Sequence, residues 1–135
     1  MRIYGNLKEY IEAGRPWDSG VMVNAIPEYS DLKTPAYVFQ GSIYGAKGRM
    51  LAVGHYAHGY KSIKCGGKNL KVHRVIAWIY CERHDEDHNE VDHIDGDKGN
   101  NHPENLRWCS RWQNINYIRN DDNQIKFELQ EGVKK

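Results

Sequence analysis

The sequence is poor in cysteine and phenylalanine and has no long hydrophobic run. Its 135 residues include three cysteines, Cys65, Cys81 and Cys109, which are odd in number and widely spaced. Such a set does not predict a disulfide framework and favours a reducing compartment. No apolar stretch approaches the roughly 20 residues of a membrane-spanning helix, and the first residues lack the apolar core of a signal peptide. These absences predict one cytoplasmic domain with no membrane partner.

Acidic residues are absent from a long internal segment. Residues 32–81 carry eight Lys or Arg and no Asp or Glu, whereas residues 82–104 carry nine acidic and two basic side chains. The formal net charge of only +1 therefore conceals a basic block followed by an acidic block. A basic block could bind a polyanion, and an acidic block could bind a divalent cation. A solvated surface with an uneven distribution of charge explains the pattern equally well.

Short elements separated by glycine and proline predict a mixed α and β fold. Aromatic and β-branched runs between residues 36 and 72, punctuated by glycines, predict a small antiparallel sheet with hairpin turns. Hydrophobic residues at helical spacing predict a helix over Val72–Tyr80, and Ser110 with Gln113 forms the capping-box pattern of a helix start. The other expected elements are a helix over 6–13, strands over 91–95 and Leu106–Cys109, a helix from 110 to about 119, and a candidate strand over 124–129.

The segment from 92 to 114 concentrates polar side chains that suit metal-assisted hydrolysis. Asp92 and His93 end the first expected strand, and Asn114 lies in the first turns of the following helix. A compact strand–loop–strand–helix unit would bring Asp92 and Asn114 to one cation. Their oxygens are hard ligands that suit Mg²⁺, whose coordination is completed by water and phosphate oxygens. His93 would then deprotonate water, since imidazole is the natural general base near neutral pH, and the set predicts phosphodiester hydrolysis.

This arrangement resembles the HNH nuclease superfamily, particularly the HNH proteins of phages and mobile introns. The shared pattern is Asp92-His93, then Asn105-Leu106, then Asn114, preceded by Val72-His73-Arg74. The resemblance covers residues 41–118 and implies an α+β fold, in which a small N-terminal antiparallel β region is followed by a ββα-metal core. It implies that Asp92 and Asn114 are metal ligands, that His93 is the general base, and that Asn105 cross-braces the hairpin.

The same resemblance implies an enzyme that hydrolyses DNA phosphodiester bonds with Mg²⁺ or Mn²⁺ and leaves 5′-phosphate and 3′-hydroxyl ends. Its partner would be double-stranded DNA, bound by a monomer or a homodimer, in the cytoplasm of a bacterial host. A phage origin rests on the resemblance alone. Residues 1–40 are expected to form an extension of unknown role, 41–118 the nuclease domain, and 119–135 a tail. The alternative is a non-catalytic DNA-binding protein on the same core, against which the intact catalytic set argues.

Beside a nuclease core, the basic block becomes a candidate DNA-binding surface. Its lysines flank the Gly66-Gly67 turn, and arginines near the scissile bond are second candidates. The candidate DNA contacts are Lys61, Lys64, Lys68, Lys71, Arg74, Arg107, Arg111 and Arg119, with Tyr56, Tyr60 and His55 as neighbours. His73 is open to two interpretations, a plain packing role or a buttress of the site.

One further spacing raises the question of structural zinc. Cys81, His84 and His88 stand as C-x2-H-x3-H, but Cys65 and Cys109 lack C-x2-C partners and no second cysteine pair lies nearby. Zinc is therefore not expected.

Overall fold

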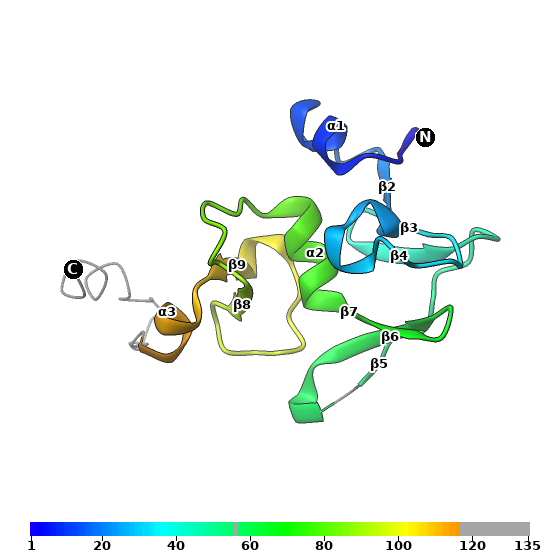
Figure 1. Cartoon of the computed structure of the whole chain (residues 1–135). Helices are drawn as coiled ribbons and strands as arrows, with labels where there is room; N and C mark the ends of the chain where they lie inside the picture. The colour runs from blue at the N-terminus through cyan, green and yellow to red at the C-terminus, as the bar shows by residue number, and fades with distance from the viewer. Residues whose placement is uncertain (56, 117–135) are drawn as a thin grey trace.

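A computed structural model describes residues 1–55 and 57–116, which form three small sheets and three α-helices (Figure 1). In chain order these elements are β1 (Ile3–Tyr4), α1 (Leu7–Glu12), β2 (Gly20–Met22), β3 (Ala36–Phe39), β4 (Ser42–Gly45), β5 (Gly54–His55), β6 (Lys61–Cys65), β7 (Lys68–Lys71), α2 (Val72–Tyr80), β8 (Glu90–His93), β9 (Leu106–Cys109) and α3 (Arg111–Asn116). Short 3-10 turns occupy Val23–Ala25, Pro27–Tyr29, Ala57–Gly59 and Pro103–Asn105. In Figure 1, α2 lies between the β8–β9 hairpin and the two N-terminal sheets.

The first sheet has the strand order β1-β2-β3-β4 and is mixed. β1 pairs in parallel with β2, with Ile3 opposite Gly20, whereas the β2–β3 and β3–β4 pairs are antiparallel. The antiparallel pairing expected over residues 36–72 is confirmed for β3–β4, β5–β6 and β6–β7. The parallel β1–β2 pair lies before that segment, where no sheet was predicted, and its crossover connection contains α1. The segment from 36 to 72 also supplies two sheets, since β3 and β4 belong to the first and β5, β6 and β7 to a second.

Helix α1 begins and ends where the sequence predicts. The Asn6 side chain caps it by accepting a hydrogen bond of 3.2 Å from a first-turn amide, and Gly14 follows its end with a left-handed φ of 87°. Tyr10 is fully buried. Its ring contacts those of Tyr4 and Tyr80, with centroids 5.3 and 6.5 Å away, so α1 is attached to the end of α2.

The second sheet turns at two consecutive glycines, as the sequence indicates. Gly66 and Gly67 have φ values of 58° and 80° and join β6 to β7, which pair antiparallel. A Cβ atom on Gly66 would lie 2.7 Å from Thr34 Oγ1, so this turn rests closely against the segment that precedes β3. Glycine at position 66 thus allows both the turn and the contact between the two sheets.

Helix α2 forms over the predicted range, Val72–Tyr80, and supplies much of the common core. Its buried side chains are Val72, His73, Val75, Ile76, Ala77 and Ile79. The helix contacts β6 and β7 on one side and β8 and β9 on the other. Each fully buried aliphatic side chain contributes roughly 1.5–3 kcal/mol. Trp108 on β9 adds a buried hydrogen bond of 3.2 Å from its Nε1 to the Ala77 carbonyl.

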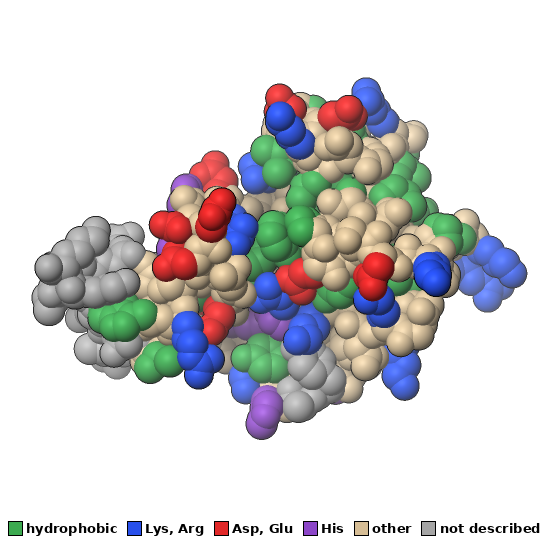
Figure 2. All heavy atoms as spheres, viewed as in Figure 1, with side chains coloured by type: hydrophobic (Ala, Val, Ile, Leu, Met, Phe, Trp, Pro, Cys, Tyr) green, Lys and Arg blue, Asp and Glu red, His purple; other side chains and the backbone are tan. Residues whose placement is uncertain are grey.

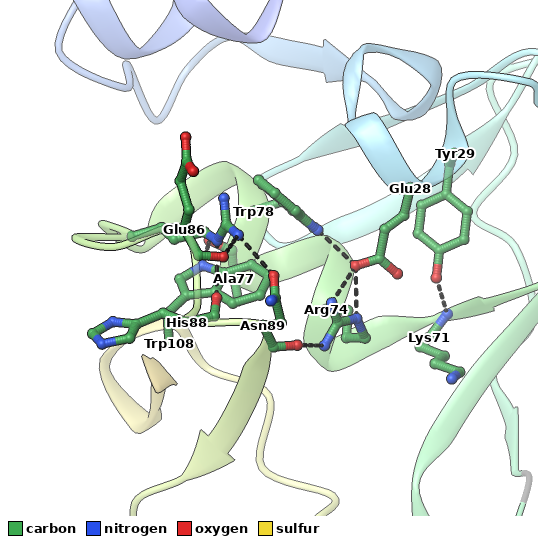
Figure 3. A network of polar contacts seen from close by, with 11 residues as sticks. Glu28, Tyr29, Lys71, Arg74, Ala77, Trp78, Glu86, His88, Asn89 and Trp108 are labelled. Carbon is green, nitrogen blue, oxygen red and sulfur yellow. Dashed lines mark hydrogen bonds and ion pairs between the residues drawn. The ribbon is translucent and has the colours of Figure 1, made fainter. Parts of the chain in front are cut away.

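An internal polar network fixes the remaining face of α2 (Figure 3). Glu28, in the 3-10 turn Pro27–Tyr29, accepts hydrogen bonds from Arg74 Nε at 2.7 Å and from Trp78 Nε1 at 2.8 Å. Arg74 also donates to the Asn89 carbonyl at 2.8 Å, directly before β8. Burial raises the pKa of Glu28, but the hydrogen bonds from Arg74 and Trp78 outweigh it and hold this pKa below its ordinary value. Glu28 therefore links the N-terminal segment to α2, and Arg74 extends this network to the residue before β8.

The β8–β9 hairpin leads into α3 and completes the predicted ββα unit. β8 lies at Glu90–His93 rather than at 91–95, because Asp95 turns the chain through its own side chain. The predicted capping box is present, since the Ser110 amide donates to Gln113 Oε1 at 2.9 Å and the Gln113 amide donates to Ser110 Oγ at 3.1 Å. This reciprocal pair fixes where α3 begins.

Several expectations extend past the described residues or stay open. Arg119, the end of the last helix and the candidate strand at 124–129 lie outside them. The division into residues 1–40, 41–118 and 119–135 stays a prediction; residue 40 lies at the turn between β3 and β4, which pair in one sheet. Among the described helices, none combines the length and apolar character needed to cross a membrane.

Replacing Glu28 by Gln is expected to lower the free energy of unfolding by about 2 kcal/mol, the usual worth of hydrogen bonds to a charged group. The folded-state pKa of Glu28 is depressed, so its contribution is present above its ordinary pKa of 4.5 and is lost as the pH falls through the lower native value. Urea unfolding at neutral and successively lower pH should therefore show the difference between the two proteins shrinking in acid. A difference that is constant with pH would contradict the pairing. Glu9→Gln, at an exposed position on α1, is the matched control.

Candidate active site

The β8–β9 hairpin positions the two adjacent residues that the sequence singled out. Its register sets Asp92 opposite Arg107 and His93 opposite Leu106. Both α2 and α3 contact β8, so successive side chains of this strand are covered on its two faces. Asp92 and His93 are each only 5% exposed. Their conformations are therefore set by the packing of the hairpin.

A pocket of about 250 Å³ opens beside these residues. Its lining includes Asp92 and His93 from β8 and Asn114 from α3. The remaining lining residues are Tyr60, Val91, Gly96 and Lys98. The structure thus brings together three sequence-predicted residues from two separate elements, in a space large enough for water and a phosphate group.

Hydrogen bonding assigns the two nitrogens of the His93 ring. Nε2 lies 2.7 Å from Asn101 Oδ1. An amide oxygen only accepts, so with this orientation of Asn101 the neutral ring carries its proton on Nε2 and its basic lone pair on Nδ1. The centroids of His73 and Tyr60 lie 5.3 and 5.9 Å from that of His93. Contacts with Asn101, His73 and Tyr60 therefore help to hold the imidazole in place.

Asp92 and Asn114 present oxygen donors to the same pocket. Asn114 Nδ2 donates to Glu90 Oε1 at 2.6 Å, which orients the amide and leaves its carbonyl oxygen as the group suited to a cation. Arg107 Nε lies 3.7 Å from Asp92 Oδ2 across the hairpin. Glu90 also lies 3.6 Å from Arg111, measured between Oε2 and Nη1. A carboxylate and an amide oxygen make a hard donor set, which fits Mg²⁺ or Mn²⁺.

Asn105 spans the loop that joins the two strands. Its Oδ1 accepts from the Asp95 amide at 3.0 Å, and its Nδ2 donates at 2.9 Å to both Asp95 Oδ1 and the Asn100 carbonyl. Hydrogen bonds from Asn100, the Asp97 amide and Asn105 hold the pKa of Asp95 below its ordinary value. This is a bracing geometry, and it fixes the loop that carries Asn101 to His93.

His73 lies behind the site, at the start of α2. It is 6% exposed, and its ring stacks on that of Tyr60 with centroids 4.9 Å apart. Burial, with His93 as the next contribution, lowers the pKa of His73 to about 3. The residue is therefore neutral over the working range of an enzyme, and it contacts His93 as an uncharged ring.

The candidate DNA contacts fall into distinct environments. Lys61, Lys64, Lys68 and Lys71 lie on β6 and β7, where Lys68 pairs with Asp31 at 2.8 Å. Arg111 is largely exposed on α3. Arg74 instead donates to Glu28 and Asn89 within the fold, so a structural role is the simpler interpretation of that residue. Figure 2 shows acidic side chains gathered beside the segment that links α2 to β8.

The three residues with zinc-like spacing, Cys81, His84 and His88, lie in different environments. Cys81 Sγ contacts the carbonyl of Pro103 at 3.4 Å, and burial raises the pKa of its thiol to about 11. The His84 side chain is 73% exposed, whereas that of His88 is 18% exposed. Within the described ranges, no three His, Cys, Asp or Glu side chains form a metal-binding group.

Three site residues were missed by the sequence reasoning. Lys98 lines the pocket, Asn101 contacts His93, and Glu90 orients Asn114. Glu90 carried a usable signal, because alternate residues of a strand share a face and it stands two positions before Asp92. Lys98 and Asn101 lie in an irregular loop, where spacing in the sequence does not indicate which way a side chain points.

Comparisons with known proteins point to one family. The family model described as HNH endonuclease matches residues 70–115. An uncharacterized HNH endonuclease, L247, of Acanthamoeba polyphaga mimivirus is 40% identical over 42 residues, which is 31% of this chain and 11% of that protein. The DNA endonuclease I-HmuI of Bacillus phage SP01 is 45% identical over 49 residues, 36% of this chain and 28% of that protein.

The likeness to I-HmuI extends to three dimensions. A solved structure that describes DNA binding and cleavage by the HNH homing endonuclease I-HmuI matches with a TM-score of 0.54 and 32% identity, over 73% of this chain and 60% of that chain. The matches thus span less than two thirds of each of these relatives. The family match at residues 70–115 includes α2, the β8–β9 hairpin and every pocket-lining residue except Tyr60. Residues 70–115, which contain this ββα unit, match the HNH endonuclease family, and the chain is similar to I-HmuI in sequence and in structure.

Proposed function

We propose that this chain is a metal-dependent endonuclease that hydrolyses phosphodiester bonds of double-stranded DNA. The observation that carries the proposal is the meeting of Asp92, His93 and Asn114 at one pocket. A general base beside two hard oxygen donors is the set that phosphodiester hydrolysis requires. Similarity to I-HmuI, a DNA endonuclease, supports DNA as the substrate.

His93 is the proposed general base. Its Nδ1 would take a proton from a water molecule in the pocket while Asn101 holds the opposite ring nitrogen. The hydroxyl oxygen would then bond to phosphorus as the bond to the 3′ oxygen breaks. The products would carry 5′-phosphate and 3′-hydroxyl ends.

Asp92 and Asn114 are the proposed ligands of a divalent cation, Mg²⁺ or Mn²⁺. Their oxygens match the preference of these hard ions, whereas the Cys81 thiol faces backbone carbonyls elsewhere in the fold. When bound, the cation would neutralise the phosphate and stabilise the leaving oxygen.

The DNA is proposed to lie along the basic residues of β6 and β7 and to reach the pocket beside α3. Phosphate contacts there would supply affinity without sequence choice. Those we retain are Lys61, Lys64, Lys68, Lys71 and Arg111. Arg107 instead pairs with buried Asp92, and Arg119 stays a candidate beyond the described residues. A monomer with one site would nick one strand, whereas a homodimer would cut both.

Two further residues are proposed to act through His93. Asn105 fixes the loop that carries Asn101, and His73 buttresses the imidazole as a neutral ring. Neither is proposed to touch the substrate, so both are positioning residues.

The purified protein is expected to nick or linearise supercoiled plasmid with Mg²⁺ or Mn²⁺ and to be inactive in EDTA. His93→Ala should lower the cleavage rate by about 10²- to 10⁴-fold, the usual contribution of a general base. His84→Ala, at an exposed histidine, is the control. The ratio of nicked to linear product would report one active site or two. Salt-sensitive DNA binding without cleavage of plasmid, host or phage DNA would favour the non-catalytic alternative.

Asp92→Asn is expected to raise the metal concentration for half-maximal cleavage by about 10-fold or more, since a charged ligand is lost. DNA affinity measured in EDTA should not weaken, because the substitution removes negative charge. Asp18→Asn, at an exposed position, should match the wild type in both measurements. An unchanged metal requirement would count against Asp92 as a ligand.

Asn105→Ala and His73→Leu are expected to lower kcat by about 10- to 100-fold, the cost of displacing a catalytic group by an ångström. KM and the shape of the pH–rate profile should stay as in the wild type, because a neutral ring and an amide contribute no charge that would shift the profile. Asn24→Ala, at an exposed asparagine, is the control. A change in KM alone, with kcat intact, would indicate that these residues serve DNA binding instead.

A further inference from the structure

Lys98 brings a positive charge to the pocket of the proposed active site. The pocket lining contains the proposed base and both proposed ligands, and Lys98 is the one Lys or Arg among the described residues that line it. The residue lies in the loop after β8, three positions beyond Asp95. A cation at this point faces the space where the phosphate of a bound substrate would sit.

Two contacts from another part of the chain hold this side chain. Lys98 Nζ donates to the His58 carbonyl at 2.9 Å and lies 4.8 Å from the centroid of the Tyr60 ring. His58 and Gly59 have left-handed φ values of 67° and 84°, which turn the chain tightly between β5 and β6. Tyr60 in turn contacts the His93 ring. The ammonium is therefore fixed in relation to the base.

These contacts leave the ammonium able to bind an anion. A lysine ammonium carries three N–H donors, and the His58 carbonyl takes one. The Tyr60 ring attracts the charge through its face and requires no N–H. Lys98 is thus oriented by the protein and still has donors for a phosphate oxygen.

We propose that Lys98 contacts a non-bridging oxygen of the scissile phosphate and stabilises the charge that grows there. The inference rests on the proposed function. As the water gives its proton to His93, its oxygen bonds to phosphorus, and the 3′ oxygen leaves with the electron pair of the broken bond and takes a proton from solvent. Fixed donors aimed at the developing charge are among the largest contributions to such reactions.

The loop of Lys98 also adjoins the basic strand β6. A Cβ atom on Gly99 would lie 3.4 Å from Lys61 Cε and 3.7 Å from Lys61 Nζ, so Lys61 lies against the same loop. Positive charge therefore continues from the proposed DNA-binding strand into the pocket. A duplex held by Lys61 would carry a phosphate toward Lys98.

The main competing interpretation is that Lys98 only clasps the 57–59 turn to the loop. Lys98→Met retains a stem of similar length over Tyr60 but removes the charge, and Lys98→Arg restores it. Under single-turnover conditions, Lys98→Met is expected to lower the cleavage rate by about 10²-fold, comparable to the loss of one oxyanion donor. Lys98→Arg should recover part of that loss. The Kd for a duplex with Ca²⁺, and the Tm, should change little in either variant.

Lysine labelling provides a readout that needs no cleavage. In EDTA, a bound duplex should slow reductive methylation of Lys98 in the wild-type protein, while exposed Lys8 on α1 is labelled at an unchanged rate. Unchanged labelling of Lys98, or a Lys98→Met variant that cleaves at the wild-type rate, would overturn this inference alone. A rate loss explained entirely by a higher Kd, or by a lower Tm, would also overturn it. A wild-type protein that cleaves no DNA would overturn the proposed function instead.

Discussion

The packing of α2 against all the neighbouring β structure is the constraint on which the rest of the molecule depends. Each sheet is small, and a two-stranded hairpin is marginally stable in water on its own. The β8–β9 hairpin gains its buried face from α2, and β6 and β7 use the same helix. Val75, Ile76 and Ile79 are almost completely buried in this shared core. The site geometry is therefore a property of the whole core rather than of the hairpin alone.

The site combines buried polar groups with specific neutralising contacts. Asp92 and His93 are each only 5% exposed; they contact Arg107 and Asn101 respectively and line the pocket. Burying a carboxylate is costly unless charge or hydrogen bonds compensate it. The neutral His73 ring adds contact area without adding charge beside a base that must become positive. The interior thus supports the reactive groups without opposing their change of charge.

Local patterns predicted several of the helices and strands, while the roles of the site residues stay predictions. The Asn6 cap, the Ser110–Gln113 box and the Val72–Tyr80 helix depend on neighbours in sequence, and all three are present. The convergence of Asp92, His93 and Asn114 followed from a strand–loop–strand–helix order. Residues whose direction depends on distant segments were harder to predict.

Lys98 and Arg74 illustrate that limit. Lys98 is oriented by a carbonyl 40 positions earlier in the chain, and Arg74 by a carboxylate 46 positions earlier. Neither pairing follows a helical or strand spacing in the sequence. From composition alone, both residues are therefore expected to be surface charges. The parallel pairing of β1 with β2 was missed for a related reason, because α1 suggested a helix but not the direction in which the chain returns.

The proposed catalytic groups from Asp92 to Asn114 lie on one short, continuous stretch of chain. Closing a short loop costs little conformational entropy, and contacts between near neighbours form rapidly. The contacts between the hairpin and the first turn of α3 therefore close short loops, whereas the Glu28–Arg74 pair closes a long one, and the hairpin still needs α2 for stability. Such a hairpin–helix unit can be inherited intact beside different preceding segments, provided that each supplies a helix with the packing face of α2.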